Sequence, residues 1–167
     1  TSIESFLMNI DNGFKLSTFI LFIPTTASVA KKVSYDNIDF ASGLEKYMYM
    51  ALKKAGIHAS YEGKTFVLFD GFHFDNESYE RQANGKGDYI NRGSKKVLPI
   101  KYTPDFLNDD LRFIIETKGR ANESFPIRWK MFKRLISDKF PGYTLYKPQN
   151  HSQCDQTITI IQSKMQY

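Results

Sequence analysis

The sequence has very little cysteine and no long apolar segment. Its single cysteine, Cys154, excludes an internal disulfide and a cysteine-rich zinc cluster, which favours a reducing compartment. The most apolar run, from Leu16 to Ile23, ends at Pro24 and is too short to span a bilayer. The first residues show no signal-peptide pattern. We therefore expect an intracellular protein, of the cytoplasm, nucleoid or an organelle matrix, with no membrane partner.

Basic charge is concentrated in one region of the chain. The 167 residues are 41% hydrophobic and 25% charged, which is typical of a single domain with a buried core. The net charge is +5, and residues 120–147 hold seven basic side chains against Glu123 and Asp138. These basic residues are Arg120, Arg128, Lys130, Lys133, Arg134, Lys139 and Lys147. The pattern indicates a surface for a polyanion, with an ordinary solvated helix face as the alternative.

Residues 102–120 are predicted to form a β-hairpin, and the chemistry of the chain centres on it. A polar turn cluster at 108–110 separates two β-prone apolar runs. Side chains alternate along a strand, so Glu116 and Lys118 are expected to face the same side. Asp105, on the partner strand, can then lie beside them.

Two carboxylates with a neighbouring lysine favour phosphodiester hydrolysis. Asp105 and Glu116 can hold a hard divalent cation through oxygen, and such a cation polarises a phosphate and activates a bound water. Lys118 can orient that water or offset charge in the transition state. The alternative is surface decoration, because an aspartate near a turn and a Glu-x-Lys triplet are both common on strand edges.

A helix is predicted from Gly43 to Lys54, with Ser42 as its N-cap and Ala55-Gly56 at its end. Glu45 occupies the third helical position, where it can close a capping box with Ser42. It can equally point toward Asp105 as a further metal ligand. Both roles stay open from the residues alone.

Three short motifs resemble those of one nuclease family. They are Ser42-Gly43-Leu44-Glu45, Tyr102-Thr103-Pro104-Asp105-Phe106 and Glu116-Thr117-Lys118-Gly119. Their residues and order resemble the phage endonuclease I family of Holliday-junction-resolving enzymes, within the PD-(D/E)xK restriction-endonuclease-like superfamily. The resemblance covers about residues 41–147.

This resemblance implies a fold, an activity and a set of site residues. The fold would be α/β, a restriction-endonuclease-like core with a central mixed β-sheet flanked by helices. The activity would be hydrolysis of branched or Holliday-junction DNA, dependent on Mg²⁺ or Mn²⁺ and carried out by a homodimer that makes paired cuts. The metal ligands would be Glu45, Asp105, Glu116 and the backbone carbonyl of Thr117, with Lys118 completing the catalytic set.

Two segments depart from the family's pattern. Residues 1–40 are expected to be an extension that packs on the core or serves in dimerisation, ahead of a nuclease domain at 41–167. Residues 75–96 form a polar insertion that either grips DNA or is a solvated loop. The longer 75–96 segment keeps open a sequence-specific restriction-like or homing-type endonuclease or nickase. An RNA substrate also stays open, because the catalytic set is indifferent to the sugar, as does a nucleic-acid-binding protein without catalysis. The residues assigned to DNA contact are Lys95, Lys96, Arg120, Arg128, Lys130, Lys133 and Arg134.

A second helix is predicted after the hairpin. It is expected to begin at a cap formed by Asn122 or Ser124, to hold Pro126 in its first turn, and to end near Lys139. Its expected core residues are Ile127, Met131 and Leu135, joined by Trp129, Phe132 and Ile136.

Local patterns predict the remaining elements. Residues 34–42 are polar and turn-like, whereas the run 65–74 is strongly β-prone. A strand is expected over 143–147, after the second helix. The Thr- and Ile-rich run at 157–162 is expected to form a last strand, within the sheet or at a dimer interface.

Overall fold

A mixed four-stranded β-sheet lies between the helices of the protein. The computed structural model describes residues 32–119 and 122–166. The strand order is β12-β11-β10-β3. Strand β10 pairs antiparallel with β3 and β11, whereas β12 pairs parallel with β11. The bounds are β3 (Ser60–Tyr61), β10 (Phe106–Asn108), β11 (Phe113–Ile115) and β12 (Thr144–Tyr146). The described chain is therefore mixed α/β, and the predicted hairpin β10–β11 is confirmed.

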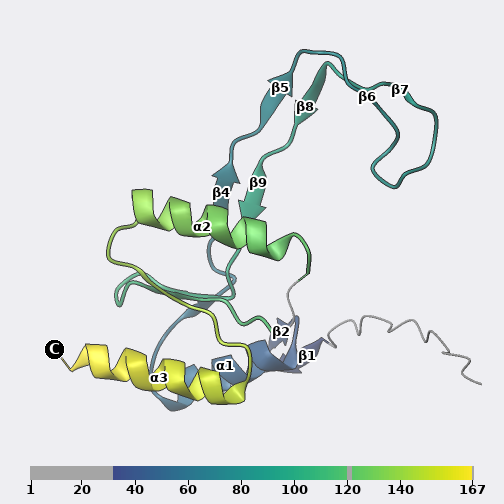
Figure 1. Cartoon of the computed structure of the whole chain (residues 1–167). Helices are drawn as coiled ribbons and strands as arrows, with labels where there is room; N and C mark the ends of the chain where they lie inside the picture. The colour runs from purple at the N-terminus through teal and green to yellow at the C-terminus, as the bar shows by residue number, and fades with distance from the viewer. Residues whose placement is uncertain (1–31, 120–121, 167) are drawn as a thin grey trace, which may run out of the picture.

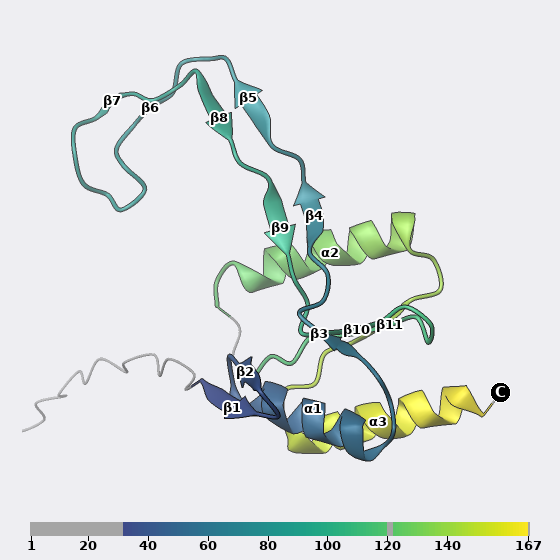
Figure 2. The ribbon, with the colours of Figure 1, turned by 180° about the vertical axis from the view of Figure 1, so that it is seen from behind.

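Helices cover both faces of this sheet (Figures 1 and 2). Helices α1 (Gly43–Lys54) and α3 (His151–Met165) lie on one face, and α2 (Phe125–Lys139) lies on the other. The residues of β11 alternate accordingly. Phe113 and Ile115 pack in the core that contains α1 and α3, whereas Ile114 packs in the core that contains α2. Each face of the sheet thus has its own hydrophobic core.

Helix α1 agrees with the prediction at both ends. Ser42 caps it, and the Ser42 Oγ accepts a hydrogen bond from Glu45 N at 3.2 Å. Gly56 follows its last turn with a φ of 69°, a conformation that glycine adopts without a steric penalty. Met48 and Leu52 are buried in the core that this helix shares with α3.

Helix α2 also forms where predicted, but its buried face differs from the expected one. Asn122 Oδ1 accepts a hydrogen bond from Phe125 N at 3.0 Å, which satisfies a free amide at the helix start. The prediction of Ile127 as a core residue was wrong, because that side chain is 65% exposed. The apolar residues of α2 cover more than one face, and aromatic packing on the sheet selects among them. The buried residues are Phe125, Trp129, Phe132 and Ile136.

A β-hairpin occupies the region expected to be turn-like. Strands β1 (Val33–Tyr35) and β2 (Ile38–Phe40) pair antiparallel around Asp36 and Asn37, which have φ values of 56° and 61°. Aspartate and asparagine tolerate this left-handed conformation, which two-residue hairpin turns require. Phe40 is fully buried in the α1–α3 core. Residues 1–31, the rest of the predicted extension, lie outside the described residues.

The last element is a helix, α3, and the predicted strand at 157–162 was wrong. Asn150 Oδ1 accepts a hydrogen bond from Gln153 N at 2.9 Å and caps the helix. Cys154, Thr157 and Ile161 are its buried residues, at a spacing that only a helix places on one face. Packing against α1 therefore overrides the β-propensity of the Thr- and Ile-rich run. None of the helices in residues 32–119 and 122–166 is long and apolar enough to cross a membrane.

A long two-stranded arm projects from the body between β3 and β10 (Figures 1 and 2). In its stem, β4 (Phe66–Phe69) pairs with β9 (Ile100–Tyr102), and β5 (Phe72–Phe74) pairs with β8 (Lys95–Val97). Toward the tip, β6 (Tyr79–Glu80) pairs with β7 (Ile90–Asn91). Phe66 and Tyr102 anchor the base of the arm in the α2 core. The polar insertion at 75–96 is the outer part of this arm, and the β-prone run 65–74 contains β4 and β5.

Candidate active site

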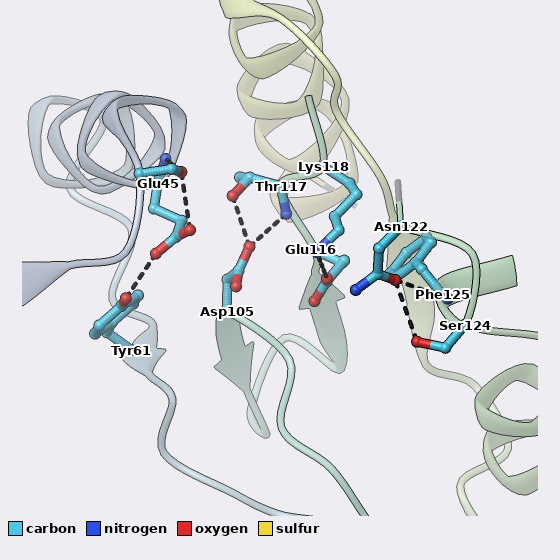
Figure 3. Close-up of polar contacts among 10 residues, drawn as sticks. Glu45, Tyr61, Asp105, Glu116, Thr117, Lys118, Asn122, Ser124 and Phe125 are labelled. Carbon is cyan, nitrogen blue, oxygen red and sulfur yellow. Dashed lines mark hydrogen bonds and ion pairs between the residues drawn. The ribbon is translucent and has the colours of Figure 1, made fainter. Parts of the chain in front are cut away.

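Asp105 and Glu116 come together at one end of the β10–β11 hairpin (Figure 3). Phe106 pairs with Ile115, so Asp105 and Glu116 extend the same register by one residue on each strand. Glu116 N donates a hydrogen bond to Tyr146 O at 2.9 Å, which continues the parallel pairing with β12. Both carboxylates are thereby fixed on adjacent rigid strands, as predicted from the hairpin.

Thr117 fixes the orientation of Asp105. Thr117 N and Thr117 Oγ1 both donate hydrogen bonds to Asp105 Oδ2, each at 2.6 Å (Figure 3). Hydrogen bonds to a charged acceptor are among the stronger ones in proteins. The aspartate is therefore held in one orientation by the residue that precedes Lys118.

Glu116 has a buried oxygen that lacks a partner. The residue is only 5% exposed, and Oε2 accepts no hydrogen bond from any described residue. The Tyr102 hydroxyl is also buried and lacks a partner of ordinary geometry, although it lies close enough for the Glu116 carboxylate to help raise its pKa. A buried polar atom without a partner is costly unless a ligand satisfies it.

The two carboxylates disfavour each other's charge. Burial and then the neighbouring charge of Glu116 raise the pKa of Asp105, with a smaller contribution from Glu45. Burial also raises the pKa of Glu116, against the opposing effects of Tyr102 and Lys118. Paired, partly desolvated carboxylates of this kind attract a cation, because positive charge removes the repulsion.

Lys118 lies on the same side as Glu116, as the alternation of side chains predicts. Its Nζ is 3.9 Å from Glu116 Oε1, and it also lies over the Phe125 ring at 4.9 Å from the ring centroid. Lys147 approaches the same ring at 5.7 Å. Two ammonium groups therefore lie over the ring at the start of α2, and that of Lys118 is also beside Glu116.

Glu45 is a buried member of the same cavity and is also part of the helix cap. Its Oε2 accepts hydrogen bonds from Ala41 N at 2.9 Å and Tyr61 Oη at 2.6 Å, and its Oε1 accepts one from Ser42 Oγ at 2.8 Å. Glu45 thus does cap the helix. Its charge nevertheless reaches the other two carboxylates, since it contributes to the raised pKa values of Asp105 and Glu116.

The carboxylates open into a cavity of about 540 Å³. Acidic side chains from β10, β11 and α1 form one part of its wall, and hydroxyl, amide and basic side chains from the base of the arm and the start of α2 form the other. The latter are Thr65, Lys101, Thr103, Asn122, Ser124 and Arg128, with Lys118 between the two groups. Such a wall can bind a phosphate beside the carboxylate pair.

The residues assigned to DNA contact do not form one cluster. Arg128 lines the cavity and donates a hydrogen bond to Lys101 O. Lys130 and Arg134 line a separate groove between α2 and β4, where Arg134 pairs with Asp138 at 2.7 Å. Lys133 lies over the Trp129 ring at 6.0 Å. Lys95 and Lys96 are on the arm, in β8, and Arg120 lies outside the described residues.

Sequence reasoning missed two tyrosines of the site. Tyr61 lies on β3, directly opposite Phe106, and brings its hydroxyl to Glu45. Tyr102 stands in the motif around Asp105 and brings its hydroxyl near Glu116. Only the position of Tyr102, three residues before Asp105, carried a signal in the sequence.

Among the described residues, no three His, Cys, Asp or Glu side chains lie close enough together to form a metal centre on their own.

Comparisons with known proteins identify a family but no described activity. No curated protein and no solved structure matches the chain. One family model matches residues 27–145, and its description is "Protein of unknown function (DUF1064)". The chain belongs to the DUF1064 family.

Proposed function

We propose that this chain is a metal-dependent endonuclease that hydrolyses DNA phosphodiester bonds, of the PD-(D/E)xK type and related to phage endonuclease I. The observation that carries the proposal is the buried pair of Asp105 and Glu116 with Lys118 beside it. Such a pair costs stability, and a purely structural role does not explain why two carboxylates share one desolvated site. A site that binds a cation and a phosphate does explain it.

The donor set fits a hard divalent cation such as Mg²⁺ or Mn²⁺. Glu116 Oε2 has no hydrogen-bond partner, and the pKa of Asp105 is raised, so a positive charge bound between the two carboxylates would stabilise both. Asp105 and Glu116 would hold the cation, with the Thr117 backbone carbonyl as a further oxygen donor. Glu45, the remaining predicted ligand, already accepts hydrogen bonds in the helix cap and would become a donor only by moving toward the pair. When bound, the cation would polarise the scissile phosphate and lower the pKa of a bound water.

Other side chains of the site would orient the groups that react and bind the phosphate. Thr117 keeps Asp105 oriented through its two hydrogen bonds. Lys118, beside Glu116, can orient the attacking water and offset negative charge on the phosphate in the transition state. Arg128 and Ser124, across the cavity, can hold the phosphate backbone without reading its sequence.

The fold and the substrate follow from the same proposal. The mixed sheet with helices on both faces supports a restriction-endonuclease-like core. We propose DNA as the substrate because five of the six charged side chains of α2 are basic. The resemblance favours branched DNA and a homodimer in which each site cuts one strand.

The experiment compares three labelled DNAs of matched sequence: a four-way junction, a linear duplex and a single strand. With Mg²⁺ or Mn²⁺, the wild-type protein is expected to make paired nicks at the junction. Lys118→Met is expected to bind the junction with little change in affinity but not to cut it. Cleavage at discrete duplex sites would favour a sequence-specific endonuclease. Binding without cleavage under both cations would overturn the proposal and leave a nucleic-acid-binding protein.

A further inference from the structure

The stem of the arm carries an exposed apolar face, here named the stem patch. In Figures 1 and 2 the outer part of the stem, β5 and β8, stands away from the helices and the sheet, whereas β4 and β9 pass beside α2. Phe69 is 51% exposed, Phe72 is 45% exposed and Leu98 is 71% exposed. The stem patch comprises Phe69, Phe72, Val97, Leu98 and Ile100, all of them exposed.

Strand register makes these side chains neighbours. Phe69 pairs with Ile100, and Phe72 pairs with Val97, so each phenyl ring lies opposite an aliphatic side chain. The two phenyl rings contact each other edge to face, with centroids 6.0 Å apart. Four side chains from four strands therefore form one continuous surface instead of scattered exposed residues. Leu98 follows Val97 in the link between β8 and β9 and is the most exposed of the five side chains.

A two-stranded ribbon with one apolar face is marginally stable without a partner. The five side chains expose roughly 500 Å² together, at about 200 Å² for a fully exposed large side chain. Two such patches facing each other would remove about 1,000 Å² from water, which reaches the lower limit for a specific protein–protein interface. Polar residues at the rim would add to that area.

Charge favours a protein over a nucleic acid as the occupant. Residues 66–102 hold six basic and five acidic side chains, whereas α2 holds five basic and one acidic. A polyanion is attracted to α2 more than to the arm. Only two of the five side chains of the stem patch are aromatic, and these two rings contact each other, so most of the patch offers no ring face on which a base can stack. A near-neutral arm with both signs of charge is complementary to a second copy of itself.

We propose that the stem patch is the interface between two copies of this chain, packed face to face about a two-fold axis. Each ribbon then covers the apolar face of the other, and the same residues meet on both sides. Thr65, Lys101, Tyr102 and Thr103 at the base of the arm line the carboxylate cavity. The dimer would therefore set the spacing between two carboxylate cavities. That use of the dimer rests on the proposed nuclease function, whereas the interface itself can be tested without it.

Sedimentation velocity over a wide range of protein concentration tests the proposal. The full chain is expected to sediment as a dimer, and Phe69→Ser combined with Phe72→Ser is expected to sediment as a monomer with an unchanged circular dichroism spectrum. Ile160→Ser, at a 45% exposed position on α3, is the matched control and should remain dimeric. A wild-type chain that stays monomeric, or a double variant that stays dimeric, would overturn the proposal.

Cysteine cross-linking gives a second test that needs no destabilising change. The native Cys154 is fully buried, so an introduced cysteine can report alone. Under mild oxidation, Leu98→Cys is expected to give a covalent dimer and Ile160→Cys is not. Equal cross-linking of the two variants would contradict the interface.

The double serine variant can also be tested for DNA binding. If it loses DNA binding while its sedimentation equals that of the wild type, the stem patch is a nucleic-acid surface and the proposal is refuted. Glu116→Gln should leave the dimer intact, which separates this test from that of the nuclease.

Discussion

Replacing Asp105 by asparagine is expected to stabilise the protein in the absence of divalent cations. Burial, then the charge of Glu116, raises the pKa of Asp105 from 3.8 to about 8. Because the folded pKa exceeds the unfolded one, the stability that the protonated carboxyl contributes is fully present below about pH 4. It is lost as the pH rises through the folded pKa. Asparagine resembles the protonated carboxyl and removes that loss.

The size of this gain follows from two opposing effects. A carboxylate buried beside a second carboxylate costs on the order of 1–3 kcal/mol of folding free energy near neutral pH. Asparagine also weakens the hydrogen bonds that Asp105 accepts from Thr117 N and Oγ1, by about 0.5 kcal/mol each. The net gain is then at most about 2 kcal/mol, which raises Tm by up to about 6 °C for a chain of this size.

Thermal unfolding in EDTA, followed by circular dichroism near pH 4 and near pH 8, measures the effect. Asp105→Asn should exceed the wild type near pH 8 and equal it near pH 4. Asp88→Asn, an exposed carboxylate of the arm, is the control and should change neither value. Addition of Mg²⁺ should then raise the Tm of the wild type but not that of Asp105→Asn. A variant that is less stable than the wild type in EDTA near pH 8 would refute the reasoning.

Three further predictions concern the site and α2. Lys118→Ala should lower the cleavage rate by at least about tenfold in single-turnover kinetics while DNA affinity changes little, because the lysine acts in the transition state. Tyr61→Phe removes a 2.6 Å hydrogen bond to buried Glu45, so urea denaturation should show a loss of about 1–2 kcal/mol. Phe132→Ala should cost about 3–5 kcal/mol, whereas Ile127→Ala should cost less than about 0.5 kcal/mol. Equal costs for the two would place the buried face of α2 elsewhere.

Elements with strong local signals could be predicted from the sequence. The Ser42 cap and the Gly56 terminus bound α1, and the polar turn at 108–110 sets the register of the β10–β11 hairpin. That register also brings Asp105 and Glu116 together, because each lies one residue beyond a paired position. The candidate site was therefore readable from local geometry.

Elements that depend on distant packing could not be predicted in the same way. The pairing of Phe66 with Tyr102 at the base of the arm joins positions far apart in the sequence, so the polar stretch between them read as a loop. The run at 157–162 has β-propensity, but it forms part of helix α3 because that helix packs against α1. Tyr61 reaches Glu45 only because β3 adds to the sheet beside β10.

The central claim is that the Asp105–Glu116 pair supports phosphodiester hydrolysis. The most direct measurement is the initial rate of nicking of a supercoiled plasmid with Mg²⁺, for the wild type and for Glu116→Gln at matched concentration and confirmed fold. We predict nicking by the wild type and a rate at least about a hundredfold lower for Glu116→Gln, because the substitution removes a negative ligand charge. Equal rates for the two proteins, or no nicking by the wild type with either Mg²⁺ or Mn²⁺, would contradict the claim.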